Sequence, residues 1–272
     1  MPSSSPALPP ELELVIFQTA AKASLHTLYT LLLVARRTRL WLEPLLYQTL
    51  RFSREYKSPN LTAMDPSRHA FLAHTVRHVV ISGHIDADIP PFVAPLRICS
   101  QMTHLALGFS TYHPVVGAAL LLLRHLRCLA FDPRVCQLTA SDAALPVFAG
   151  LTHLELFKML PDTAEFCAAL PRLTHLALNT LNEAAITQML AACPRLELLV
   201  ILQDEENPMG VLLSAAPAAL THDQRLVITA YVDWDEGVLD SWNYWAVAEE
   251  FLAQKRSGAI PKTQFVADRD ET

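Results

Sequence analysis

A recurring apolar pattern dominates most of the chain. It has three apolar positions spaced φxxφxφ, and its clearest copies are Leu151–Leu156 (LTHLEL) and Leu173–Leu178 (LTHLAL). Seven copies begin at Tyr47, Val76, Met102, Leu126, Leu151, Leu173 and Leu196, and a degenerate copy lies at Leu226–Ile228. Successive copies start 29, 26, 24, 25, 22 and 23 residues apart. This narrow spread predicts stacked units, each containing one strand and one helix.

The segments between the copies carry helix signals. Asp162 and Glu165 resemble a capping box ahead of an apolar stripe, and Asn182-Glu183 opens a second helical stretch. One strand with one returning helix cannot bury its apolar face alone, so we expect the units to share a continuous core. The predicted fold class is α/β. We expect a solenoid over residues 47–232 with parallel strands on its concave face and helices on its convex face.

This frame resembles the leucine-rich repeat family in its irregular form, over about residues 47–230. In that family an Asn or Cys follows the strand and bonds backbone groups of the loop. Here the positions after Leu107, Leu156 and Ile201 offer no obvious equivalent. We therefore expect less regular turns than in a standard horseshoe. The alternative is an ordinary α/β domain in which the leucine spacing is coincidental.

Residues 8–50 follow a different, helical pattern. Leu8-Pro9-Pro10-Glu11 forms a rigid entry, and apolar stretches around Leu28–Val34 and Leu40–Leu46 follow a first helical segment. One face of that first segment carries Leu12, Val15, Ile16 and Thr19. Three short helices cannot bury all of this apolar surface internally, so we expect an exposed apolar face suited to a partner.

This segment resembles an F-box. Leu8, Pro9 and Glu11 match the opening Leu-Pro-x-Glu, Ile16-Phe17 matches the following Ile-Leu pair, and Leu28, Leu31, Leu33, Val34, Arg36 and Arg37 match the later apolar and basic stretch. Thr38 stands where the family has a Trp, and Trp41 lies one turn further on. Followed by irregular leucine-rich repeats, the segment is similar to that of small fungal F-box proteins of the basidiomycete type.

The resemblance implies a non-catalytic adaptor of an SCF-type cullin-RING ubiquitin ligase. The F-box would bind a Skp-type linker, and the repeats would bind a protein substrate. The residues expected on the linker face are Leu8, Pro9, Leu12, Ile16, Leu28 and Leu31. Two alternatives remain open: residues 8–50 are only a helical cap on the solenoid, or the protein is a leucine-rich-repeat scaffold that binds proteins independently of a ligase.

Composition narrows the classes of partner. The 21 basic and 27 acidic residues give a charge of -6 with no basic run, which argues against nucleic acid. Five cysteines form no CxxC motif and predict reduced thiols in a cytoplasmic or nuclear protein. No apolar run approaches the ~20 residues of a membrane helix. Enzyme motifs such as GxSxG, HExxH and a Walker loop are missing, so no enzyme activity and no cofactor are predicted.

A histidine column is the main candidate for chemistry. The third position of the frame holds His78, His104, Cys128, His153, His175 and Leu198 in successive units, and the fifth position of one unit holds Glu155. Both positions point away from the core, onto the concave face.

Three interpretations compete for the column. A metal could bind the histidine pairs with Cys128, although a linear column converges poorly on one ion, and no metal is predicted. The second is a substrate-contact strip that gains charge near pH 6, formed by His78, His104, His153, His175 and Glu155. The third is structural: duplication copies whatever residue the ancestral strand held.

The C-terminal part, residues 233–272, is rich in tryptophan. Asp240-Ser241 can cap a helix from about 241 to 256 that ends before Gly258. Its helical spacing aligns Trp242, Trp245, Ala246, Glu249 and Leu252. The helix is expected to cover the last repeat as a lid, or alternatively to present its aromatic residues to a substrate. The final PKTQFVADRDET is predicted to be a loose tail. The predicted organisation is thus 1–46, 47–232 and 233–272.

Overall fold

The structure is a computed structural model that describes residues 8–53, 61–82, 90–108, 112–179, 182–203, 223–230 and 244–267. The chain divides into two compact units, residues 1–49 and 50–272. We call the first the head and the second the repeat unit. The described residues contain no helix that combines the length and apolarity needed to cross a membrane.

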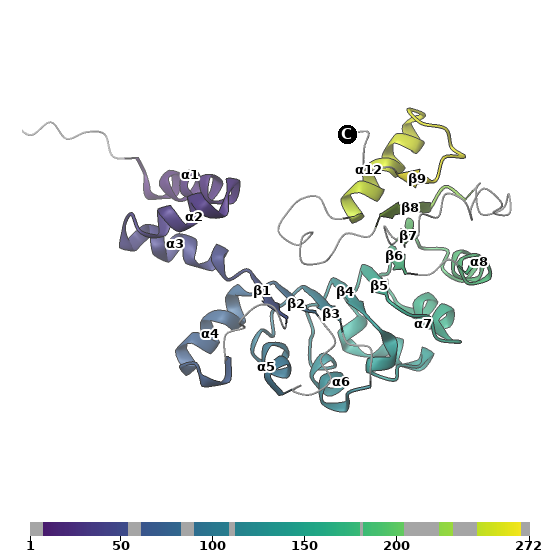
Figure 1. Ribbon diagram of the computed structural model, residues 1–272, viewed down its shortest axis with the longest axis horizontal. Helices are drawn as coiled ribbons and strands as arrows, with labels where there is room; N and C mark the ends of the chain where they lie inside the picture. The colour runs from purple at the N-terminus through teal and green to yellow at the C-terminus, as the bar shows by residue number, and fades with distance from the viewer. Residues whose placement is uncertain are drawn as a thin grey trace, which may run out of the picture. The chain divides into compact units, whose positions relative to one another are not determined.

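The head consists of three helices, as its apolar pattern predicts: α1 (Pro10–Ala23), α2 (Leu25–Leu32) and α3 (Arg36–Leu46) (Figure 1). Ser24 separates the first two and caps α2, because its Oγ accepts a hydrogen bond of 3.1 Å from the Thr27 amide. The small core contains Ala21, Leu28 and Leu42, and the partly buried Phe17 and Trp41 pack against it.

Arg37, the second residue of the basic pair, contributes to this packing. Arg37 lies 2.8 Å from the Glu13 carboxylate and places its guanidinium 5.8 Å from the centre of the Trp41 ring. The Trp41 ring in turn lies 6.5 Å from Phe17. These contacts connect α1 to α3, so Trp41 provides an aromatic anchor one turn beyond Thr38.

The repeat unit is an α/β structure built on one sheet. Its described residues form nine strands, ordered in space as in the sequence. They are β1 (Thr49–Phe52), β2 (His78–Ile81), β3 (His104–Leu107), β4 (Cys128–Phe131), β5 (His153–Leu156), β6 (His175–Leu178), β7 (Leu198–Gln203), β8 (Leu226–Ala230) and β9 (Val266–Ala267). Neighbouring strands from β2 to β9 pair in parallel, which confirms the α/β class and the parallel sheet of the predicted fold.

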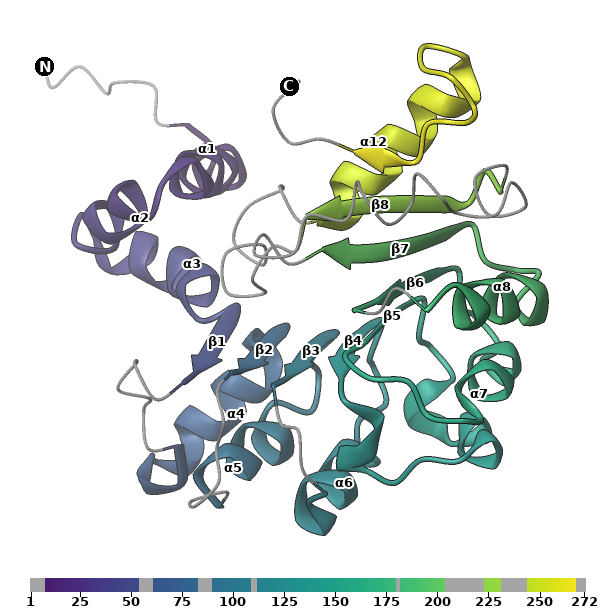
Figure 2. The same cartoon turned by 45° about the vertical axis from the view of Figure 1, so that its right-hand side comes forward.

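Helices flank the sheet on two sides (Figures 1 and 2). Outside the curved row of strands lie α4 (Pro66–Thr75), α5 (Pro90–Ile98), α6 (Pro114–Leu120), α7 (Thr163–Ala169) and α8 (Glu183–Ala192). The last helix, α12 (Tyr244–Ser257), lies on the opposite side. Three of the outer helices begin with Pro, whose preset φ favours the first helical position, so these three prolines mark helix starts.

The repeat pattern predicts the core well. Apart from the half-buried Tyr47, the apolar residues at frame positions 1, 4 and 6 of the seven copies are buried, with Met102, Leu105 and Leu107 all at 0 % exposure in one unit. Burial follows from strand geometry, because residues two apart share a face of the sheet. Between β4 and β5 the chain forms only short 3-10 helices, Pro133–Val135, Ala140–Ala144 and Pro146–Phe148, so this unit lacks the α-helix that the repeat predicts.

Two local predictions have different outcomes. Asn182 caps α8 as predicted, since its Oδ1 accepts a hydrogen bond from the Ala185 amide. The capping box at Asp162 is wrong: its carboxylate instead accepts a hydrogen bond of 3.1 Å from the Ala140 amide of the preceding unit. A contact between neighbouring units thus replaces the local cap.

The predicted loose tail is also partly wrong. Val266 and Ala267 form β9 and pair with Ile228 and Thr229 of β8. The Ile228 amide donates a 2.7 Å hydrogen bond to the Phe265 carbonyl. Pairing with β8 satisfies backbone groups that an edge strand would leave open.

Candidate functional site

The histidine column exists as the frame predicts. In the sheet register His78, His104, Cys128, His153, His175 and Leu198 are successive Cα partners. Each of these residues begins its strand. The four histidines are half-buried, whereas Cys128 and Leu198 are buried. The column therefore presents imidazoles along one edge of the sheet face opposite the outer helices.

A threonine precedes three of these histidines and orients their rings. The Oγ1 atoms of Thr103, Thr152 and Thr174 lie 2.9, 2.9 and 2.8 Å from Nδ1 of the following histidine. The same hydroxyls lie 3.3, 3.2 and 3.4 Å from a backbone carbonyl of the preceding unit. Because each hydroxyl occupies Nδ1, Nε2 is the ring nitrogen left for other partners. The repeated Thr-His dipeptide was the available signal for this role, which sequence reasoning missed.

The histidines form two ring pairs. His78 and His104 meet edge to face, with centroids 4.5 Å apart and an interplanar angle of 80°. His153 and His175 are stacked, with centroids 4.2 Å apart and an angle of 15°. Cys128 lies between the two pairs in the register.

The helix α12 covers the C-terminal part of this face. Its residues Trp245, Ala248 and Leu252 pack with Ala177 of β6, Val200 of β7 and Val227 of β8 in one buried cluster. Trp245 is only 8 % exposed. The lid interpretation of this helix is therefore confirmed, and Trp245 is not displayed as an open aromatic anchor. The Gly258 φ of +79° ends the helix as expected.

Two details of that prediction concern other residues. Trp242 lies outside the described residues. Glu155 was expected to contact a substrate, but it is 0 % exposed. The Tyr244 hydroxyl of α12 donates a 2.7 Å hydrogen bond to Oε2 of the buried Glu155. The prediction for Glu155 is wrong because the helix covers the concave face at that strand.

A half-exposed carboxylate of α12 meets the stacked histidine pair. Glu249 Oε1 lies 3.2 Å from His175 Nε2 and 3.9 Å from His153 Nε2. The Trp245 ring packs nearly perpendicular to His153, with centroids 5.1 Å apart, and lies 6.0 Å from His175. Of all described residues, only His153, His175 and Glu249 form a group of three metal-ligating side chains with ligand atoms within 4.8 Å of one another.

The column is uncharged at neutral pH. Burial lowers the pKa of His153 to about 3, and the adjacent His175 and His104 act in the same direction. Burial, with smaller contributions from His104 and Arg77, lowers the pKa of His78 to about 4. Burial also lowers the pKa of His175, although Glu249 opposes that effect. The expected gain of charge near pH 6 is therefore wrong, because desolvation disfavours the imidazolium.

The head places the predicted linker-face residues in two groups. Leu8, Leu12 and Ile16 are 52, 51 and 54 % exposed, and Pro9 is exposed as well. Leu28 is 3 % exposed inside the head core, and the half-buried Leu31 packs against that core. The prediction for Leu28 is wrong because α2 buries this side chain within the head, whereas the prediction for the half-buried Leu31 stays a prediction.

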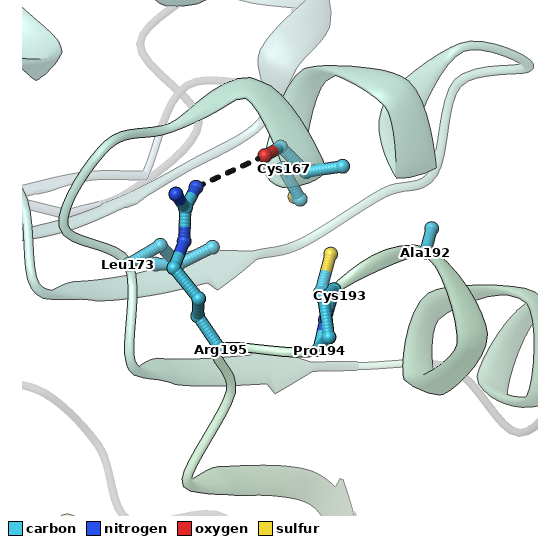
Figure 3. Close-up of a pocket in the computed structure, with 7 residues that line it drawn as sticks. Cys167, Leu173, Ala192, Cys193, Pro194 and Arg195 are labelled. Carbon is cyan, nitrogen blue, oxygen red and sulfur yellow. Dashed lines mark hydrogen bonds between the residues drawn. The ribbon is translucent and has the colours of Figure 1, made fainter.

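A cavity of about 250 Å³ lies between the ends of α7 and α8 (Figure 3). Arg195 closes the end of α7 by donating from Nη2 to the Ala168 and Leu170 carbonyls, at 3.2 and 2.8 Å. Cys167 and Cys193 line the cavity, but burial raises the pKa of Cys193 to about 11 and that of Cys167 well above its usual value. Neither thiol is therefore an activated nucleophile.

No model of a known protein family matches the chain. Over 202 residues, or 67 % of the chain, it is 29 % identical to the geranylgeranyl transferase type-2 subunit alpha of Sus scrofa. The chain spans 28 % of the length of that relative. This is a partial similarity to one region of a longer protein.

Proposed function

We propose that the protein is a non-catalytic adaptor of an SCF-type cullin-RING ubiquitin ligase, in which the head binds a Skp-type linker and the repeat unit binds a protein substrate. The observation that carries the proposal is the outward apolar face of the head. It supports the role that the F-box resemblance implies.

This face follows from the two apolar stripes of α1. One stripe, with Phe17 and Ala21, packs into the head core. The other contains Leu12, Val15 and Ile16, whose exposures are 51, 58 and 54 %. A short helix that is apolar on two sides needs a second packing partner, because leaving that stripe in water forgoes about 1.5–3 kcal/mol for each large side chain that could be buried.

Exposed apolar residues concentrate in the head. Of the 13 large hydrophobic side chains that are exposed among the described residues, nine lie between Leu8 and Leu40. They are Leu8, Leu12, Val15, Ile16, Leu25, Tyr29, Leu33, Val34 and Leu40. Apolar groups concentrated in this way mark a protein interface more often than an ordinary surface.

Within the repeat unit, the N-terminal strands are the better candidates for binding a substrate. The α12 helix covers the concave face over β5 to β8, whereas His78 and His104 lie on β2 and β3. We therefore place the substrate contact at His78 and His104.

Co-purification tests the linker contact. We expect the full chain to retain a Skp-type linker, and Ile16→Asp to abolish retention because it places a charge in the centre of the apolar face. Leu122→Asp is a matched control, since Leu122 is 65 % exposed but belongs to the repeat unit. Circular dichroism of each variant verifies folding. Failure of the wild-type chain to retain the linker, or retention by Ile16→Asp, contradicts the adaptor role.

The alternative is a scaffold that binds proteins without a ligase. Its supporting observation is that residues 50–272 form a compact unit of their own. That alternative predicts capture of the same protein partners by the wild-type chain and by Ile16→Asp, with no linker in either sample.

A further inference from the structure

We propose that His153, His175 and Glu249 form a binding site for a divalent transition-metal ion, with Zn²⁺ the best-fitting ion. The site connects β5 and β6 to α12. It is independent of the linker contact proposed for the head.

The distances suit a single ion. The three ligand atoms lie within 4.8 Å of one another, and the Glu249 oxygen is 3.2 Å from His175 Nε2. Nitrogen and oxygen ligands about 2.0–2.2 Å from a tetrahedral Zn²⁺ are about 3.3–3.6 Å apart. The Glu249 oxygen lies 3.9 Å from His153 Nε2, and its carboxylate is 53 % exposed and free to adjust its rotamer toward an ion.

The positions of the protons on the two imidazole rings support a bound cation. Thr152 and Thr174 each contact a carbonyl oxygen, which can only accept, and a histidine Nδ1. The arrangement that satisfies both contacts sends the hydroxyl proton to the carbonyl and the Nδ1 proton to the hydroxyl. The neutral imidazoles then carry their lone pairs on Nε2, facing the Glu249 carboxylate. Three acceptors that converge without a donor are stabilised by a cation between them.

The surroundings match those of known metal sites. A ligating histidine usually donates its second ring N–H to an oxygen, which fixes the tautomer and the ring orientation. Thr152 and Thr174 occupy that position here. The Trp245 ring packs against both imidazoles, and the exposed Glu249 leaves a path from solvent. Three protein ligands with one open position complete a tetrahedron with water.

The ligand types select the class of ion. Two imidazoles and one carboxylate suit Zn²⁺ and neighbouring late first-row ions. Ca²⁺ and Mg²⁺ instead prefer sets of oxygen ligands. The proposed ion therefore differs from the hard cations that an exposed acidic cluster would attract.

The chain contains a matched internal control. His78 and His104 also form a close ring pair, and Thr103 contacts His104 Nδ1 as Thr152 and Thr174 contact their histidines. Among the described residues, however, this pair belongs to no group of three ligands within 4.8 Å. Substitutions there test whether paired histidines are sufficient or whether Glu249 is required.

Calorimetric titration with ZnCl₂ tests the site, using the tag-free full chain freed of metal by chelator. We expect one ion per chain, loss of that binding in His175→Ala, and at least a roughly tenfold weaker affinity in Glu249→Gln. Glu250→Gln and His104→Ala are the controls and should bind as the wild type does. Zn²⁺ should also raise the unfolding midpoint of the wild type but not that of His175→Ala, because only the folded chain assembles the site.

Several results overturn the proposal. One is the absence of Zn²⁺ binding by the wild-type chain. Another is unchanged affinity in both Glu249→Gln and His175→Ala. Binding that persists in those variants but disappears after alkylation of the thiols assigns the ion to cysteines and also overturns it. Circular dichroism of every variant distinguishes a lost ligand from a lost fold, and Glu249→Gln keeps the test valid because its half-exposed side chain is not needed for the core.

Discussion

The two halves of the histidine column share the same repeat pattern, with histidine at its third position, but have different surroundings. In the N-terminal half, His78 and His104 stand beside Val80, Ala106 and Ala130, which pack with the partly buried Phe157. In the C-terminal half, His153 and His175 lie under Trp245 and Glu249 of α12. The repeat determines where each histidine stands, and the non-repeating helix determines what it contacts.

This difference separates packing from function. Duplicated strands present equivalent side chains at intervals of about 4.8 Å along the sheet. That spacing alone produces a row of imidazoles, which is not by itself a binding site. A site forms where a segment outside the repeat adds a ligand of another kind, as Glu249 does at His175.

Loss of the Trp245 ring should have the largest effect. Trp245→Ala removes a buried aromatic side chain from the cluster under α12, and we expect about 3–5 kcal/mol lower stability in chemical denaturation. Phe157→Ala, which removes the partly buried ring of the other half, should cost clearly less. Equal losses would mean that both halves are covered to the same extent.

The Tyr244 hydroxyl is the next test. Tyr244→Phe removes the donor to the buried Glu155 carboxylate, and we expect about 1–3 kcal/mol lower unfolding free energy. Tyr244→Phe combined with Glu155→Gln should recover part of that loss, since the neutral amide tolerates burial better. Additive effects of the two substitutions in a double-mutant cycle would argue against direct coupling.

Acidification should weaken both halves. The folded-state pKa of His78 is about 4, below the ordinary value near 6.5, so the unfolded chain binds more protons between those values. The stabilisation from neutral His78 is complete above pH 6.5 and is lost as the pH falls toward 4. His78→Gln should therefore reduce the difference in unfolding free energy between pH 7 and pH 5 by about 1–2 kcal/mol. Denaturation in chelator-containing buffer at both pH values measures this, and an unchanged difference would contradict it.

The smallest effect on stability is expected at the threonines. Thr174→Val and Thr103→Val each remove one hydroxyl contact to a histidine, at a cost of about 0.5–1.5 kcal/mol. Their effects on Zn²⁺ binding should differ, however. Thr174→Val should weaken binding about 10–100-fold, whereas Thr103→Val should leave it unchanged. Equal Zn²⁺ affinities of the two variants in calorimetric titration would remove the distinction between the halves.

Sequence periodicity predicts the strands, their register and the three helices of the head. It fails where a residue has two possible packing partners. Leu28 belongs to an apolar stretch whose sequence predicts a partner-binding face, but α2 turns it into the head core. Ile16 faces outward because Phe17 and Ala21 occupy the inner side of α1. The spacing defines the stripes of a helix, and packing between helices decides which stripe is buried.

The sequence by itself therefore determined the repeat, the buried leucines and the aligned histidines, because side-chain alternation and helical spacing are local properties. Only the tertiary structure decided which residues contact the histidine column. Tyr244 and its partner Glu155 are 89 residues apart, and Glu249 reaches His175 from a helix that shares none of the repeat pattern. Such contacts depend on how a whole helix packs across the sheet, which is a property of the assembled core and not of any short stretch of residues.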